Sequence, residues 1–161
     1  MLNNSIKKIC ILFFLYFLII SKTVAQSQEN YNKNMELACT LYLTKKEIPK
    51  NVLLRLTPKT QDNFSLLYNT THPETEIGRT DFFYDITQYI FNEVLLYKNM
   101  KFYDASLQLA SFADGEFAEG FIENLEKIIN LNINKFCKTI KNKEYRLHNP
   151  IKYYSKFYKC N

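Results

Sequence analysis

The cysteines are the residues of this sequence whose chemistry depends most on where they lie. Cys39, Cys137 and Cys160 follow an N-terminal segment with the features of an export signal, so we expect them to enter an oxidising compartment. A Cys137–Cys160 disulfide would tie the C-terminal segment to the end of the preceding helix, and a Cys39–Cys160 disulfide would tie it to the first helix. Either bond would contribute a few kcal/mol. The alternative is that Cys39 and Cys137 are buried small apolar side chains, since both lie beside apolar helix faces.

Side chains suited to metal binding or nucleophilic catalysis are scarce. The sequence has two histidines, His72 and His148, and no HExxH, Glu-x-x-His or Cys-x-x-Cys spacing. Cys137, His148 and Cys160 form at most a partial ligand set, and no recognisable motif pairs a cysteine with a histidine. We therefore predict no catalytic residue, no metal site and no cofactor, and we expect both histidines to be exposed.

Four glutamates share one side of a predicted helix. Glu116, Glu119, Glu123 and Glu126 are spaced by three and four residues, which places their carboxylates along one stripe. Carboxylates that act as a catalytic acid and base need an apolar pocket and a partner from another element. The sequence indicates neither, so we interpret the stripe as a solvated helix face.

The C-terminal part of the chain has the strongest charge contrast. Residues 127–161 contain nine basic residues and one acidic residue, a balance of +8, whereas residues 26–126 contain nine basic and fifteen acidic residues, a balance of −6. Basic and aromatic residues alternate there, a mixture that can contact phosphate, acidic glycans or anionic lipid headgroups. The candidate surface for an anionic ligand consists of Lys141, Lys143, Arg146, Lys152, Lys156 and Lys159.

A structural role for the same segment is the interpretation that we prefer. The segment would pack on the acidic body of its own chain, with its aromatic rings inward and its lysines outward, because so many free rings would be poorly soluble. The aromatic residues concerned are Tyr145, Tyr153, Tyr154, Phe157 and Tyr158.

The N-terminal segment has the parts of a cleavable signal peptide. Lys7 and Lys8 precede an apolar run over residues 9–20, which is shorter than the about 20 residues that a membrane-spanning helix needs. Thr23 and Ala25 supply small residues at a signal peptidase site, so we predict cleavage after Ala25. We expect a periplasmic or secreted protein without a membrane span after processing. An uncleaved signal anchor is the alternative.

Apolar residues recur with helical spacing along most of the remaining chain. The predicted helices cover residues 29–44 and 82–97 and run from Phe102 up to Asp114–Gly115, with short helices around Val52 and Phe64 between the first two. Thr57 followed by Pro58 predicts the start of the second short helix. Residues 69–79 lack an apolar period and predict the longest loop.

The last long helix is the clearest in the sequence, with Asp114 as its predicted N-cap. Its predicted core face consists of Phe117, Phe121, Leu125, Ile128, Asn132 or Ile133, Phe136 and Ile140. No segment shows the sustained alternation of a β-strand. The sequence therefore predicts an all-α fold, a compact bundle of five or six helices with a C-terminal segment docked on it.

Length and composition fit one folded domain. The chain has 161 residues and a formal charge of +5, and removal of residues 1–25 leaves 18 basic against 16 acidic residues. We divide it into a signal peptide over residues 1–25, a helical domain over residues 26–141 and a basic aromatic C-terminal segment over residues 142–161.

These features predict a non-enzymatic binding protein outside the cytoplasm, whose ligand is an unidentified protein or an anionic surface and which has no specific affinity for nucleic acid. One alternative is an enzyme with a site assembled from distant Glu or Tyr side chains. The other is a small periplasmic inhibitor or immunity-type protein, in which an acidic patch such as Glu74–Glu76 occupies a partner's active site. A deep pocket with convergent polar groups would favour the enzyme.

Overall fold

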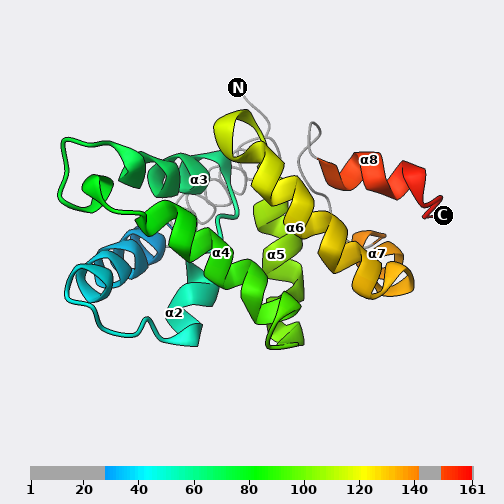
Figure 1. Cartoon of the computed structure of the whole chain (residues 1–161), viewed down its shortest axis with the longest axis horizontal. Coiled ribbons are helices and arrows are strands. Elements are labelled where there is room, and N and C mark those ends of the chain that lie inside the picture. The colour runs from blue at the N-terminus through cyan, green and yellow to red at the C-terminus, as the bar shows by residue number, and fades with distance from the viewer. Residues whose placement is uncertain (1–27, 142–149, 161) are drawn as a thin grey trace, which may run out of the picture.

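The computed structural model describes residues 28–141 and 150–160, which form helices and turns (Figure 1). Neither described range contains a strand, and the predicted all-α class is confirmed. The N-terminal helix covers residues 28–43. The helices that follow are α2 (Lys50–Arg55), α3 (Gln61–Tyr68), α4 (Phe82–Leu95), α5 (Tyr103–Ala110), α6 (Ala118–Leu131), α7 (Ile133–Ile140) and α8 (Pro150–Phe157). The 3-10 helices are η1 (Asn69–Thr71), η2 (Ile77–Arg79), η3 (Met100–Phe102) and η4 (Gly115–Phe117).

Eight α-helices lie in the described part of the chain, where the sequence predicts five or six. One additional helix arises because the predicted last helix breaks at Asn132. This residue has an extended backbone (φ −166°, ψ 92°), and its side chain accepts a hydrogen bond of 2.8 Å from the N–H of Lys135, which caps α7. The other additional helix is α8, formed by the C-terminal segment.

The start of α3 also differs from the prediction. Thr60, rather than Thr57, caps this helix, because its backbone is extended (φ −129°, ψ 166°) and its hydroxyl accepts a hydrogen bond of 3.2 Å from the N–H of Asn63. Thr57 is buried in the turn that leads to the helix. Both threonines lie a few residues before the apolar face of α3, so residue type alone did not show which of them is the cap.

The core surrounds α4, which contacts α2, α5 and α6 (Figure 1). Phe83 from this helix packs edge-on against Phe64 of α3 and near Phe121 of α6, with ring centroids 6.3 Å away in each case. Stacked and edge-on rings of this kind stabilise a core beyond the area that they bury. On the predicted face of the last helix the buried residues are Phe121, Leu125, Ile128 and Phe136, whereas Asn132 and Ile133 are exposed at the break.

The C-terminal helix α8 lies beside α6 and α7, at the end of the molecule away from the N-terminal helix (Figure 1). It also contacts α5. The segment is therefore docked on the bundle, as the fold prediction requires.

Candidate functional site

One face of α8 attaches the helix to the bundle. Ile151 and Tyr154 are buried, and both belong to the main hydrophobic core. The Tyr154 hydroxyl donates a hydrogen bond to the Glu126 carboxylate on α6, and the Tyr158 hydroxyl donates one of 3.2 Å to the side-chain oxygen of Asn130. Burial, followed by the hydrogen bond to Glu126, raises the pKa of Tyr154. The predicted docking is thus confirmed for this face.

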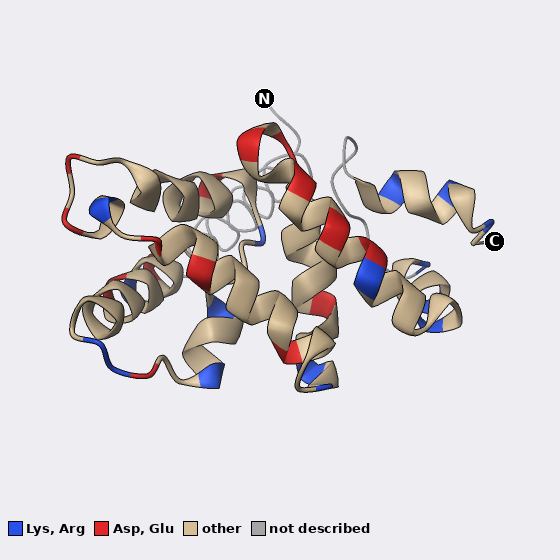
Figure 2. Cartoon of the chain, in the orientation of Figure 1, with Lys and Arg blue, Asp and Glu red and all other residues tan. Residues whose placement is uncertain are grey.

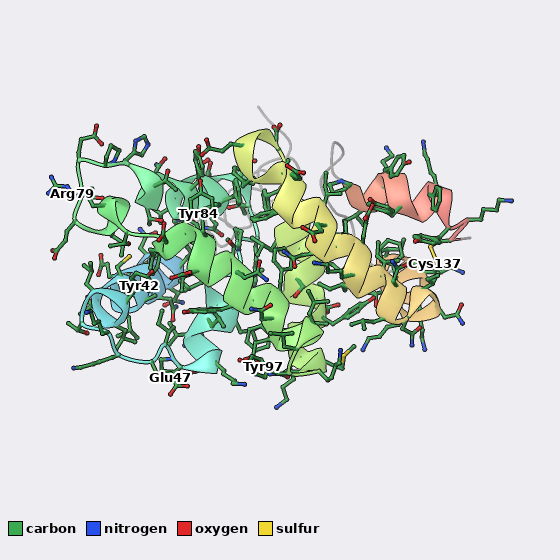
Figure 3. The ribbon with its side chains drawn as sticks, viewed as in Figure 1. Tyr42, Glu47, Arg79, Tyr84, Tyr97 and Cys137 are labelled. Carbon is green, nitrogen blue, oxygen red and sulfur yellow. A yellow bond between two sulfur atoms is a disulfide. The ribbon has the colours of Figure 1, made fainter. Side chains whose placement is uncertain are left out.

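A disulfide between Cys137 and Cys160 closes the attachment, with the two Cα atoms 4.9 Å apart (Figure 3). This is the first of the two predicted pairings. Because the bond engages both sulfurs, neither offers a thiolate to the partial ligand set considered with His148. His148 itself lies outside the described residues.

Cys39 is the unpaired cysteine of the described chain, partly buried against the core. Burial, despite an opposing backbone hydrogen bond, raises the pKa of its thiol to about 11. The thiol is therefore protonated at neutral pH, which fits a packed small side chain better than a nucleophile.

The opposite face of α8 is exposed and carries two aromatic rings. Tyr153 and Phe157 are 63% and 64% exposed, and their rings stack with centroids 6.3 Å apart and planes 19° apart. The expectation that the aromatic residues of this segment all point inward is wrong for this pair. With 3.6 residues per turn, a helix that buries Ile151 and Tyr154 must direct Tyr153 and Phe157 away from the core.

Lysines gather near the disulfide. Lys138 and Lys141 lie one and four residues after Cys137, and Lys156 and Lys159 lie four and one residues before Cys160, so the bond brings four cations together. We call these four residues the basic cluster. All four are exposed, and none forms an ion pair with a carboxylate of the described residues.

The basic cluster contains three residues of the predicted anionic-ligand surface, Lys141, Lys156 and Lys159. Lys152, a fourth, is exposed on the outer face of α8. Figure 2 shows lysines on α8 and carboxylates along α6. Lys143 and Arg146 belong to residues 142–149, which the structure does not describe.

Two other lysines of the positively charged residues 127–161 have structural roles. Lys135 holds its Nζ 4.7 Å from the centre of the Tyr103 ring, and Lys127 pairs with Glu123 at 2.7 Å. Burial raises the pKa of Tyr103 to about 12, with Asp104 adding to the shift. Since Lys135 and Lys127 are engaged, they are not part of the basic cluster.

The glutamate stripe on α6 and η4 is exposed, as interpreted from the sequence, but it also connects elements. Glu116 accepts hydrogen bonds from Tyr68 at 3.0 Å and from Tyr84 at 3.4 Å, which joins η4 to α3 and α4. Glu123 forms an ion pair with Lys127 in the same helix, and Glu126 accepts the hydrogen bond from Tyr154 of α8. These contacts assign structural roles to most of the stripe.

Two open clefts were not anticipated from the sequence. The first, which we call the amide cleft, has a volume of about 900 Å³ and lies between the N-terminal helix, the α2–α3 connection and α5. The second, the tyrosine cleft, has a volume of about 790 Å³ and lies between the N-terminal helix, the loop that follows it and α4. Tyr42, Glu47 and Tyr97 line the tyrosine cleft (Figure 3). The walls of both clefts come from segments far apart in the chain, which explains why local sequence patterns did not predict the clefts.

A buried carboxylate lines the tyrosine cleft. Glu93 has a side chain that is 6% exposed; Lys50 Nζ lies 2.8 Å from one of its carboxylate oxygens, and the side-chain amide of Asn99 donates to the other at 2.6 Å. Burial raises the pKa of Glu93, but the hydrogen bonds from Lys50 and Asn99 and the Lys50 charge outweigh burial and leave the pKa below its usual value. This ion pair was not predicted from the sequence, although an acidic residue inside the apolar run of α4 was a usable signal.

A second polar contact in the same cleft joins two elements. The Tyr42 hydroxyl donates a hydrogen bond of 2.5 Å to Asp85, and burial, followed by this bond, raises the pKa of Tyr42. The Tyr42 ring also packs edge-on against Phe82, with centroids 5.2 Å apart. These contacts fix the N-terminal helix to α4.

The remaining sequence predictions are tested only in part. In residues 28–141 and 150–160, no three His, Cys, Asp or Glu side chains are grouped to hold a metal ion. Over the same ranges, no helix combines the length and apolarity needed to cross a membrane. His72, Glu74 and Glu76 are exposed, which agrees with the expectation for His72 but does not test an inhibitory role for the acidic pair. The predicted signal peptide lies outside the described residues, so cleavage and export stay predictions.

Comparisons of this chain with protein-family models, with curated proteins and with solved structures found no match.

Proposed function

We propose that this chain is an extracytoplasmic binding protein that attaches to anionic membrane surfaces through the outer face of α8 and the basic cluster. The observation that carries the proposal is the exposed ring pair of Tyr153 and Phe157 beside four lysines that form no ion pair with a described carboxylate. Helices that lie in a membrane interface combine exposed aromatic residues with lysines in this way. Export rests on the N-terminal pattern in residues 1–25.

The magnitudes favour joint action of charge and rings. A lysine near an anionic membrane contributes about 1 kcal/mol, so the four lysines of the basic cluster contribute about 4 kcal/mol, equivalent to a dissociation constant of about 1 mM. Charge alone therefore gives weak attachment. Burying a large apolar side chain contributes roughly 1.5 to 3 kcal/mol, so partial insertion of Tyr153 and Phe157 would strengthen binding at least about tenfold.

The geometry of attachment supports the same role. The disulfide, together with buried Ile151 and Tyr154, fixes α8 on the bundle before any ligand is met. Binding then does not require the helix to be ordered at that moment, a cost that weakens membrane helices that fold on contact. A lipid surface also complements the two rings better than a fully hydrated polyanion does, because it offers an apolar layer directly beneath its charged groups.

Vesicle binding tests the proposal. The oxidised protein should cosediment with phosphatidylcholine vesicles that contain phosphatidylglycerol, and not with phosphatidylcholine alone. Binding should fall as salt rises through the physiological range, where the Debye length is about 8 Å. The Lys156→Gln variant should bind more weakly, whereas Lys98→Gln, remote from α8 in sequence and outside the basic cluster, should bind as the wild type does.

An aromatic pair of variants separates insertion from charge. Phe157→Ala should weaken binding about tenfold, whereas Tyr97→Ala, which removes a ring that is 67% exposed on the loop after α4, should not. Equal binding to neutral vesicles, or equal weakening by Lys156→Gln and Lys98→Gln, would contradict the proposal. Binding to an acidic polysaccharide without binding to anionic vesicles would also overturn it.

A further inference from the structure

The amide cleft is a second site, separate from α8. It is formed by the N-terminal helix, the residues after α2, the start of α3 and the exposed side of α5, and its volume of about 900 Å³ falls in the range of small-molecule sites. None of its lining residues belongs to the basic cluster or to α8. An inference from this cleft is therefore independent of the proposed membrane surface.

A buried hydroxyl without a partner lies in the wall of the cleft. Thr57 lines the cleft and is 6% exposed, and its side-chain oxygen has no hydrogen-bond partner among the described residues. A buried polar group left in this state is unfavourable, and native structures usually satisfy such groups with protein, water or a ligand. The oxygen itself is shielded from solvent, so this hydroxyl is an unsatisfied group within the wall of the cleft, and a ligand in the cleft does not touch it.

Amide side chains add further hydrogen-bonding capacity. Asn63 is 7% exposed and lines the cleft near Thr57; it donates from its amide nitrogen to Gln28 at 2.7 Å. Asn30, Asn34 and Gln108 line the same cleft. A primary amide offers a donor and an acceptor side by side, which matches the hydroxyl groups of a polyol or sugar.

The charged residues of the cleft are mainly cations. Arg55, Lys59 and Lys101 line it and are exposed, and none forms an ion pair with a carboxylate of residues 28–141 or 150–160. Asp104 is the acidic residue among the lining residues. The guanidinium of Arg55 and the two ammonium groups can bind a carboxylate by charge-assisted hydrogen bonds.

We infer that the amide cleft binds an acidic carbohydrate, with the hydroxyl groups of the sugar on the amides and its carboxylate among Arg55, Lys59 and Lys101. A neutral sugar would leave the three cations without a partner. A small carboxylate without hydroxyl groups would not use the donors and acceptors that the amides keep beyond their hydrogen bonds within the protein. The acidic carbohydrate satisfies both sets of groups at once.

Titration calorimetry with digalacturonate as the probe tests this inference, with neutral methyl glucoside and acetate as comparison ligands. Digalacturonate should bind, and the two comparison ligands should bind at least about tenfold more weakly, since each lacks one class of contact. Lys101→Gln and Arg55→Gln should each weaken digalacturonate binding about tenfold or more. Lys156→Gln, which alters the basic cluster outside the cleft, should leave it unchanged.

Lys101→Gln changes an exposed side chain, so it should leave the melting temperature of the unliganded protein unchanged, and a loss of digalacturonate binding then reflects the cleft and not the fold. Absence of digalacturonate binding, equal binding of methyl glucoside, or equal weakening by Lys156→Gln and Lys101→Gln would overturn the inference.

Discussion

The disulfide gives the sharpest stability prediction. Cys137 and Cys160 are separated by 23 residues, and the chain-entropy relation for a loop of that length predicts a stabilisation of about 3 kcal/mol at 25 °C. The Cys137→Ser/Cys160→Ser double variant should lose about this amount of unfolding free energy. The bond also joins the middle of α7 to the turn after α8, so its loss should be felt most strongly by α8.

The balance of energies indicates that α8 depends on the disulfide. Burying Ile151 and Tyr154 contributes roughly 3 to 6 kcal/mol, and the hydrogen bonds of Tyr154 and Tyr158 contribute about 1 kcal/mol each. Ordering the backbone of the eight residues of α8 costs about 8 to 16 kcal/mol, only part of which the internal hydrogen bonds of the helix offset. Without the covalent link we therefore expect α8 to detach while the bundle stays folded.

Urea unfolding and amide hydrogen exchange measure the two effects. The experiment is best performed in a Cys39→Ser background, which removes thiol exchange with the unpaired cysteine. Reduction of the protein that retains Cys137 and Cys160 should reproduce the double variant, and exchange protection should fall in α8 but not in α4. A loss below about 1 kcal/mol, or full protection of α8 in the double variant, would refute this reasoning.

Other variants test the core, a buried ion pair and a helix cap. Phe121→Ala should cost about 3 to 5 kcal/mol in urea unfolding, because its ring is 4% exposed and packs among other rings; a loss below about 1 kcal/mol would mean that it lies outside the core. The folded-state pKa of Glu93 is lowered, so its interactions stabilise the protein above the unfolded pKa of about 4.3 and are lost as pH falls through the folded value. Glu93→Gln should therefore destabilise the protein at pH 7 and flatten the decline of stability with acid, and an unchanged acid profile would contradict this assignment. Asn132→Ala should cost about 1 kcal/mol by removing the α7 cap, whereas Ala at the neighbouring exposed Asn134 should cost little; equal losses would argue against the cap.

Helices with a complete local signal could be predicted from the sequence. The N-terminal helix and α4 each contain apolar residues at helical spacing, and their observed bounds differ from the predicted ones by no more than two residues at either end. In α4 the predicted central position is correct because apolar residues occur on almost every side of that helix. In these two helices the apolar periodicity of the sequence and the burial seen in the structure identify the same residues as helical.

The break at Asn132 shows where local pattern is insufficient. An asparagine inside an amphipathic run fits both a polar position on a continuous helix and the cap of a new one. The choice depends on whether Phe136 reaches the core better from a bent chain, and in the structure Phe136 is completely buried. Packing of α7 against the bundle is a long-range property, so the apolar period alone predicted one continuous helix.

The two clefts could not be predicted from local sequence patterns, because segments that are distant in the chain form their walls. Thr57, Asn63 and Lys101 fall on three different parts of the chain and share no motif, yet all three line the amide cleft. The sequence pattern indicates Thr57 only as a helix cap, but Thr60 caps α3, and the Thr57 hydroxyl is buried in the wall of the cleft.

Exposure alone does not distinguish the α8 ring pair from other surface aromatic residues. Tyr97 is 67% exposed and Phe157 is 64% exposed, so both rings offer water a similar apolar area. Their electrostatic surroundings differ, however. The Tyr97 ring lies 5.3 Å from Lys50 Nζ, and Glu93 compensates that charge, whereas no described carboxylate pairs with Lys156 or Lys159 beside Phe157. A partner with negative charge above an apolar layer therefore gains both interactions at Phe157 and only the apolar one at Tyr97. That difference is why the aromatic control variant belongs at Tyr97.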